Sequence, residues 1–164
     1  MAITTHRAWV YGDDVNTDVI FPGKYTYTLK DKTDIAAHAL EDLDPSFASQ
    51  VQPGDVIVAG RNWGMGSSRE QAVTCLVYNG LRAIIAESFG GIYFRNCINQ
   101  GLHPIVIPGA ARLLHTGDVV LIDDEARQVI IAGQAFAMPP LPLSVQAILE
   151  AGGLVAMLKQ RFQG

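Results

Sequence analysis

The sequence feature that most restricts the fold is an alternation of short apolar runs with stretches of helix-forming residues. The run Asp55–Ala59 (DVIVA) follows the turn signal Pro53-Gly54, and a second run of the same length stands at Arg82–Ala86 (RAIIA). Runs this short and this apolar are typical of strands buried on both faces. Helix formers fill Ser68–Tyr78 between them, and Asn79-Gly80 ends that stretch. The sequence therefore predicts a strand, a loop, a helix and a strand in succession, which is the unit of an α/β domain.

The same alternation continues toward the C-terminus. Three further helices are expected, at Gly91–Asn99, Ser144–Ala151 and Leu154–Phe162. A strand is expected at Pro104–Ile107, and an antiparallel hairpin is expected from Asp118–Asp123 and Gln128–Ala132. With 164 residues, 49% of them hydrophobic, the chain is long enough for one core and too short for two ordinary domains. We expect a single domain over residues 1–164.

The composition excludes several classes of function. A net charge of −4 with scattered Lys and Arg residues argues against nucleic-acid binding. No apolar run approaches the ~20 residues that cross a bilayer, and the first ten residues lack the features of a signal peptide, so a cytoplasmic protein that does not bind membranes is expected. The two cysteines, Cys75 and Cys97, belong to no CxxC pattern and are expected to be buried, reduced thiols. No two histidines have the spacing of metal ligands, so no metal is expected in this chain.

One segment, Tyr11–Lys32, resists assignment to helix or strand. It is polar, has turn residues at intervals and offers little that would anchor it in a core. Long irregular segments of compact domains are more often binding loops than idle connectors, and disorder is the competing interpretation.

The segment with the most chemical information is Gly60–Ala72 (GRNWGMGSSREQA). Its three glycines permit tight turns and the close approach of a ligand, and a helix is expected to follow with Ser67 or Ser68 as its N-cap. Unpaired amide groups and the forked guanidinium of Arg69 would together bind an anion, phosphate as well as carboxylate. No Lys-Ser or Lys-Thr follows the last glycine, and no GxGxxG follows a strand, so neither a P-loop nor a dinucleotide site is indicated. The alternative is a glycine-rich turn with an ordinary serine cap and a solvated arginine.

This segment resembles the motif G-x-N-F/W-G-x-G-S-S-R-E-x-A of the swivelling domain in the aconitase superfamily. The opening DDVNTDVIFPGKY is similar to that domain's D-x-[ND]-T-D-x-I-x-P, and RAIIAESFGGIYFRNCINQGLHPI resembles a third motif that follows in the right order. The resemblance extends over nearly the whole chain. It implies an α/β fold, the three-layer β/β/α swivelling domain of the aconitase C-terminal domain. Stand-alone copies of that domain are small subunits of 3-isopropylmalate dehydratase, of homoaconitase and of related hydro-lyases such as 2,3-dimethylmalate dehydratase.

The resemblance also implies roles for individual residues. Ser67 would be the catalytic base that removes a proton beside a carboxylate, and Ser68 and Arg69 would bind the substrate carboxylate. A serine hydroxyl is a weak base, so its alkoxide needs donors, and the amides around Gly66 together with the helix N-terminus are the donors expected. No cofactor is expected in this chain. An iron–sulfur cluster is implied in a partner large subunit, because two cysteines are too few to hold a cubane cluster.

The loop after Ile20-Phe21-Pro22 bears on the choice of substrate. In the family, the residue two after the loop's tyrosine helps select the substrate side chain, apolar for isopropylmalate and arginine for homoaconitate. Here that tyrosine is Tyr25, and the selecting position is Tyr27, which has no cation for a third carboxylate. Lys24 and Lys30 remain within reach of a carboxylate, and the alternative for Tyr27 is a surface residue in a mobile loop.

The resemblance therefore implies a hydro-lyase subunit that interconverts 2- and 3-isopropylmalate by dehydration and rehydration, as in leucine synthesis. The same chemistry on a methyl-substituted malate or on homoaconitate is the closest alternative. A non-catalytic module that binds anions is the alternative of another class.

Overall fold

A seven-stranded sheet forms the centre of the structure, a computed structural model that describes residues 3–163. The strands are β1 (Ile3–Val10), β2 (Val56–Ala59), β3 (Ala83–Ala86), β4 (His103–Val106), β5 (Val119–Asp123), β6 (Gln128–Ile131) and β7 (Gln134–Ala137). Their order across the sheet is β4-β3-β2-β1-β5-β6-β7. β1 to β4 are parallel to one another, whereas β5 to β7 are antiparallel. β1 belongs to both halves, because it pairs with β2 in parallel and with β5 in antiparallel register.

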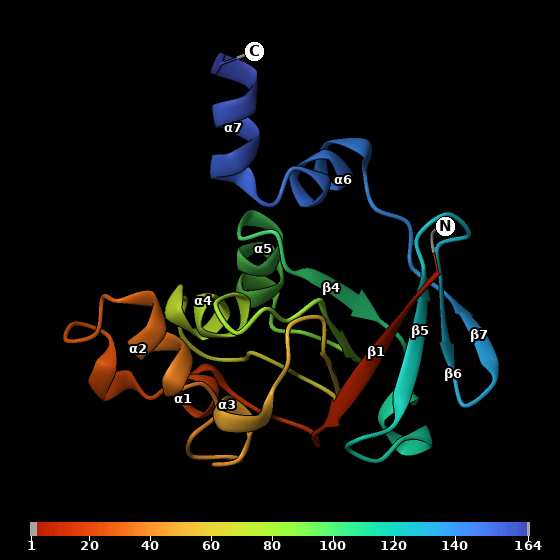
Figure 1. Ribbon diagram of the computed structural model, residues 1–164, viewed down its shortest axis with the longest axis horizontal. Helices are drawn as coiled ribbons and strands as arrows, with labels where there is room; N and C mark the ends of the chain where they lie inside the picture. Colours follow the sequence, from red (N-terminus) through yellow and green to blue (C-terminus); the bar gives the residue numbers. More distant parts are fainter. Residues whose placement is uncertain (1–2, 164) are drawn as a thin grey trace.

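Helices cover one side of the parallel half. They are α1 (Thr17–Ile20), the 3₁₀ turn η1 (Gly23–Tyr25), α2 (Lys32–Ala37), α3 (Phe47–Gln50), α4 (Gln71–Val77) and α5 (Gly91–Asn99). A second 3₁₀ turn, η2 (Ala110–Leu113), follows β4, and α6 (Leu143–Glu150) and α7 (Leu154–Gln163) end the chain. In Figure 1, α1 to α5 lie on one side of β1, and the antiparallel strands β5 to β7 lie on the other.

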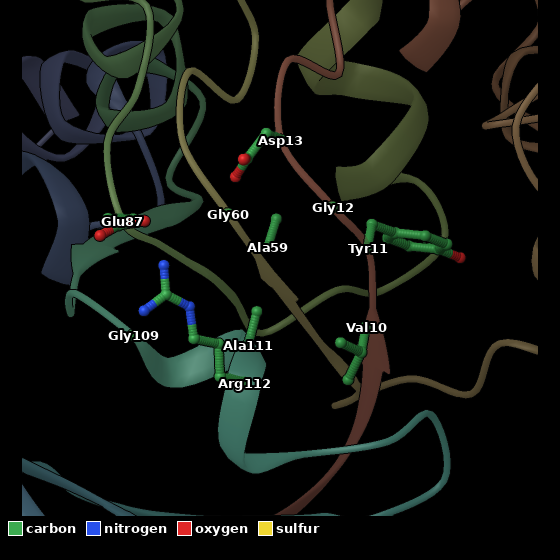
Figure 2. A pocket seen from close by; sticks show the side chains of 10 residues that line it. All are labelled: Val10, Tyr11, Gly12, Asp13, Ala59, Gly60, Glu87, Gly109, Ala111 and Arg112. Atoms are coloured by element: carbon green, nitrogen blue, oxygen red, sulfur yellow. The ribbon is translucent and has the colours of Figure 1, made fainter.

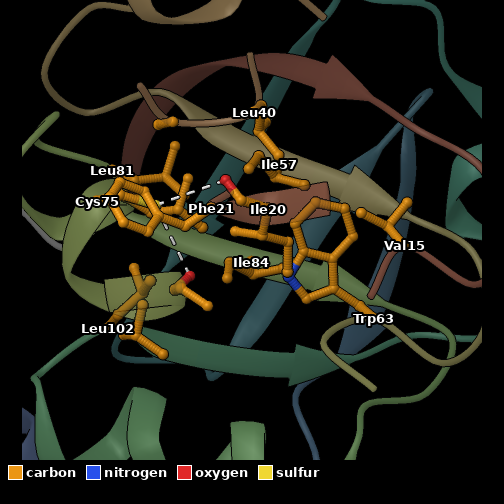
Figure 3. Packing of buried hydrophobic residues seen from close by; sticks show 14 of the residues in the cluster. Val15, Ile20, Phe21, Leu40, Ile57, Trp63, Cys75, Leu81, Ile84 and Leu102 are labelled. Atoms are coloured by element: carbon orange, nitrogen blue, oxygen red, sulfur yellow. Dashed lines mark hydrogen bonds between the residues drawn. The ribbon is translucent and has the colours of Figure 1, made fainter. Parts of the chain in front are cut away.

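The helix side of the parallel strands carries one of two hydrophobic cores. Side chains alternate between the two faces of a strand, so every second residue of β2 and β3 faces the helices. Ile57 and Ile84 are fully buried there, and Figure 3 shows them packed with Ile20, Phe21 and Trp63. Each fully buried Ile or Phe contributes roughly 1.5–3 kcal/mol of transfer free energy.

The opposite face of the same strands forms the second core. Val58 and Ile85, which follow Ile57 and Ile84 in sequence, are buried on this face. They belong to one cluster with Val120 and Ile122 of β5 and Val129 of β6. The antiparallel half of the sheet must therefore curl over this face. Helices, parallel strands and antiparallel strands are thus stacked as three layers, and the expected β/β/α architecture is confirmed.

Most of the expected elements are present, with ends shifted by one to three residues. β2 and β3 occupy the two apolar runs, β5 and β6 form the expected hairpin, and α5 has the expected bounds. The expectation that Tyr11–Lys32 lacks an anchor is wrong, because Val15, Ile20 and Phe21 are all buried. This segment instead folds into α1 and η1, and it lies beside the glycine-rich loop.

The last two helices extend beyond α5, at the top of Figure 1, where α7 contacts α6 and α5. None of the described residues in these two helices is buried. Within residues 3–163, no helix has the length and apolar character that crossing a membrane requires.

Candidate active site

The glycine-rich loop between β2 and α4 is hydrogen-bonded to the N-terminal segment around the start of α1. The amide of Gly64 donates to the carbonyl of Val15 at 2.8 Å, and the amide of Thr17 donates to the carbonyl of Met65 at 2.9 Å. Asn16 caps α1, because its side chain accepts from the amide of Val19. Two segments about fifty residues apart in sequence are therefore held side by side.

Trp63 and Gly64 fix this loop to the core. Trp63 is fully buried, and its amide donates to the carbonyl of Ser88 in the loop after β3 at 3.0 Å. Gly64 has a φ of +81°, a conformation that only glycine adopts readily. A Cβ at this position would lie 2.5 Å from Cδ2 of Tyr93, so the loop packs directly on that buried ring.

Ser67 and Arg69 meet at the surface beyond this anchor. The Nε of Arg69 donates to the Oγ of Ser67 at 3.0 Å, and the hydroxyl of Thr17 lies 3.3 Å from the same Oγ. Ser67 is exposed, and the side chain of Arg69 keeps 20% of its surface accessible. The hydroxyl thus lies next to a guanidinium on a face that another chain can cover.

Asp18 and Thr26 hold the far end of the guanidinium. Nη2 of Arg69 forms an ion pair with the carboxylate of Asp18, and Nη1 lies 3.4 Å from the hydroxyl of Thr26. A side chain at Gly23 would overlap Arg69, so this arrangement requires a glycine there. Asp18 and Thr26 were not among the residues that the sequence placed at the site. The T-D pair in the opening motif was the available signal for Asp18.

The expected helix cap at Ser67 or Ser68 is wrong. α4 begins at Gln71, its N-cap is Glu70, and no side chain of the described residues caps it. The Oγ of Ser67 instead accepts from Arg69, and the amide of Ser67 donates to the hydroxyl of Thr17 at 3.2 Å. The hydroxyl of Ser67 is therefore engaged by side chains of other residues and does not cap α4.

The first turn of α5 also lies beside the glycine loop. Gly66 and the preceding loop residues share a hollow of about 180 Å³ with Gly91 and Ile92 at the start of α5. In the described part of the chain, the amides of Gly66 and Ser68 donate to no acceptor. Two free amide donors therefore remain beside Ser67.

Within residues 3–163, Lys24 and Tyr27, which the sequence placed at the substrate, form no side-chain hydrogen bond or ion pair with Ser67 or Arg69. The Nζ of Lys24 lies 5.1 Å from the centroid of the Tyr25 ring, which is itself 4.1 Å from the ring of His38. Tyr27 is 89% exposed. Both side chains sit on the same loop as Thr26, at the rim of the site.

The two cysteines are free and buried, as expected. Burial raises the pKa of both thiols well above the ordinary value, so neither is a thiolate. Among residues 3–163, no three His, Cys, Asp or Glu side chains gather as a metal site.

A cavity of about 420 Å³ lies beside the loop, at the carboxyl ends of β1 and β2 (Figure 2). Its rim carries Asp13, Glu87 and Arg112, whereas Ser67 and Arg69 do not line it. Asp13 accepts hydrogen bonds from the amide and the side chain of Arg61, and these bonds lower the pKa of its carboxyl group. The same bonds fix the junction between strand and loop at Gly60. The candidate active site is the open surface next to this cavity.

Comparison with known proteins agrees with this geometry. The Aconitase C-terminal domain profile matches residues 14–110, which include both the N-terminal segment and the glycine loop. The chain is 42% identical to the 3-isopropylmalate dehydratase small subunit of Thermodesulfovibrio yellowstonii, over 94% of this chain and 93% of that protein. It is 48% identical to the methanogen homoaconitase small subunit of Methanothermobacter thermautotrophicus, over 91% of this chain and 86% of that protein.

A solved structure extends the similarity to the whole fold. The crystal structure of 3-isopropylmalate dehydratase from Methanocaldococcus jannaschii superposes with a TM-score of 0.89 at 43% identity, covering 98% of this chain and 96% of that one. This chain therefore belongs to the aconitase C-terminal domain family.

Proposed function

We propose that this chain, as a single swivelling domain over residues 1–164, is the small subunit of a hydro-lyase of the 3-isopropylmalate dehydratase type. It would interconvert 2- and 3-isopropylmalate by removing and adding back water. The observation that carries the proposal is the exposed Ser67 hydroxyl, 3.0 Å from the guanidinium of Arg69, in a chain whose relatives are named as such subunits.

Ser67 acts as the base in this proposal, and Arg69 makes that role feasible. An alkoxide beside a guanidinium accepts a charge-assisted hydrogen bond, which is about twice as strong as a neutral one. The Thr17 hydroxyl at 3.3 Å is a second donor to the same oxygen. Loss of one such donor typically costs ~10²–10³ in kcat. The arginine is therefore a donor in addition to the amides that the sequence predicted.

The substrate carboxylate binds to donors that the free chain leaves unused. A guanidinium has five N–H groups, and three of those in Arg69 go to Ser67, Thr26 and Asp18. Two remain, together with the amides of Gly66 and Ser68 and the hydroxyl of Ser68. In the proposal, these groups hold the acid with its neighbouring C–H toward the base.

A large subunit with an iron–sulfur cluster is the proposed partner. When bound, the cluster supplies a Lewis acid for the leaving hydroxyl. Both thiols of this chain are buried and protonated, which fits a cluster held entirely by the partner. The exposed face with Ser67 and Arg69 is the surface that the partner would cover, and the cytoplasm is the proposed location.

Isopropylmalate is the proposed substrate because the rim residue Tyr27 is a neutral aromatic side chain. Lys24 directs its ammonium group toward Tyr25, so it does not supply the cation that a third carboxylate needs. Homoaconitate is the second candidate, since the methanogen relative named above is a homoaconitase small subunit.

Reconstitution with the large subunit tests the proposal. Ser67→Ala is expected to abolish turnover while leaving carboxylate binding nearly intact. Ser144→Ala, which removes an exposed hydroxyl on α6, serves as the matched control and keeps full activity. Full turnover in Ser67→Ala would contradict the assignment of the base, whereas no turnover in the unmodified reconstituted pair would favour a non-catalytic anion-binding module. A panel of isopropylmalate, methyl-substituted malates and homoaconitate, compared by kcat/KM, then identifies the substrate.

A further inference from the structure

A second hollow of about 290 Å³ lies at the opposite end of the parallel strands from Ser67. Arg82 stands immediately before β3, and His103 is the first residue of β4, so both mark the amino ends of these strands. Arg127 reaches the hollow from the turn between β5 and β6. The glycine loop leaves the carboxyl end of β2, which runs parallel to β3, so the two sites are separated by the length of the strands.

Arg127 is the feature of this hollow that the fold does not explain. Its Nη2 atom is buried and has no hydrogen-bond partner among the described residues. Buried donors are almost always satisfied in native proteins, and an unsatisfied charged one is especially costly. The backbone of Arg127 also has a φ of +54°, a left-handed conformation that a residue with a Cβ adopts at a cost.

Among the described residues, Arg127 is the cation of this hollow that has no counterion. The guanidinium of Arg82 is occupied by Asp124, whose two carboxylate oxygens lie at 2.8 and 3.0 Å. Burial, together with the nearby Arg82 and Arg127 charges, lowers the pKa of His103 to about 4, so its ring is neutral at pH 7. Glu150 on α6 is exposed and forms no ion pair within residues 3–163.

We propose that this hollow binds a small monocarboxylate with a short apolar group, and that the carboxylate pairs with Arg127. A guanidinium forms charge-assisted hydrogen bonds with a carboxylate. Leu141 and Leu149 line the same hollow and provide contact for an alkyl group. Glu150 at the same hollow repels a second negative charge, so a monoanion fits better than phosphate. This site does not depend on the proposed catalytic role of Ser67.

Thermal unfolding of the full 164-residue chain with isobutyrate as the probe tests the site. Saturating isobutyrate is expected to raise Tm by roughly 3–6 °C at about ten times its dissociation constant, whereas chloride at equal ionic strength has a smaller, unsaturable effect. Arg127→Asn removes the guanidinium and keeps a residue that tolerates a left-handed backbone. This variant is expected to fold and to lose the isobutyrate effect.

Two controls separate this site from the active site and from simple loss of charge. Arg69→Gln removes the other carboxylate-binding arginine, and Arg161→Gln removes an exposed charge on α7; both are expected to keep the full Tm shift. In the unmodified chain, the NMR signal of the His103 ring should move with the same isobutyrate dependence. The proposal is overturned if the Tm shift with isobutyrate is no larger than the shift with chloride or with phosphate. It is also overturned if the shift persists in Arg127→Asn or disappears in Arg69→Gln.

Discussion

Replacing Gly64 by Ala measures how strongly the active-site loop depends on its contact with the core. The alanine would have to adopt a φ of +81°, which costs roughly 1–2 kcal/mol for a residue with a Cβ. Its Cβ would also lie 2.5 Å from Cδ2 and 2.7 Å from Cβ of Tyr93. That ring is 2% exposed, and its hydroxyl donates to the carbonyl of Ala72 at 2.8 Å, so it cannot turn aside without losing a buried hydrogen bond.

Overpacking of this kind costs roughly 1–3 kcal/mol, so the total for Gly64→Ala is about 2–5 kcal/mol. Gly133 provides a matched control. It has a φ of +80°, but no heavy atom of the described chain lies within 4 Å of the position that an added Cβ would take there. Gly133→Ala is therefore expected to lose only the backbone term, about 1–2 kcal/mol.

Urea unfolding of the two variants measures the difference directly, provided that the m-value stays constant. Thermal unfolding should place Gly64→Ala below Gly133→Ala by roughly 2–4 °C for each kcal/mol. Equal losses in the two variants would refute the reasoning, because the contact with Tyr93 would then carry no cost.

Two further predictions concern polar groups away from the active site. The buried carboxylate of Asp55 accepts hydrogen bonds from the guanidinium of Arg7, the indole of Trp9 and the backbone amide of Gln52. Asp55→Ala should therefore lower the free energy of unfolding by about 3 kcal/mol. A loss below about 1 kcal/mol in urea unfolding would contradict this estimate. The pKa of His103 falls from 6.5 in the unfolded chain to about 4 in the fold, so the unfolded state binds more protons between these values. Stability should therefore drop by up to about 3 kcal/mol as the pH falls from 6.5 to 4, and His103→Gln should flatten the curve in that window. An unchanged pH dependence in His103→Gln would count against the lowered pKa.

The strands that the sequence predicts most directly are the two that are buried on both faces. β2 and β3 have four buried residues each, so their apolar runs are continuous. β1 was missed because its first three residues are exposed and polar residues interrupt the rest. β7 was missed because it is a short edge strand with three of its four residues exposed. Local pattern therefore identifies a strand most directly where the fold buries both of its faces.

For the proposed active site, the sequence indicated candidate residues but not their contacts. Ser67 and Ser68 have the composition of a helix cap, and sequence alone does not reveal that Arg69 and Thr17 engage Ser67 instead. The contact to Thr17 joins residues fifty positions apart, and the ion pair to Asp18 spans fifty-one. Such pairings are decided by how the N-terminal segment packs, which local propensity does not encode.

Because the guanidinium of Arg69 donates to Ser67, the proposed site depends on the residues that position this side chain. Amides at a helix terminus are fixed by the backbone, whereas the guanidinium of Arg69 is positioned by Asp18 and Thr26 on a separate segment. That segment is anchored by Ile20 and Phe21 in the core below. The proposed reactivity of Ser67 would therefore depend on two chain segments packed on one hydrophobic core. The buried residues of a stretch that looks like a polar loop hold Arg69 in place.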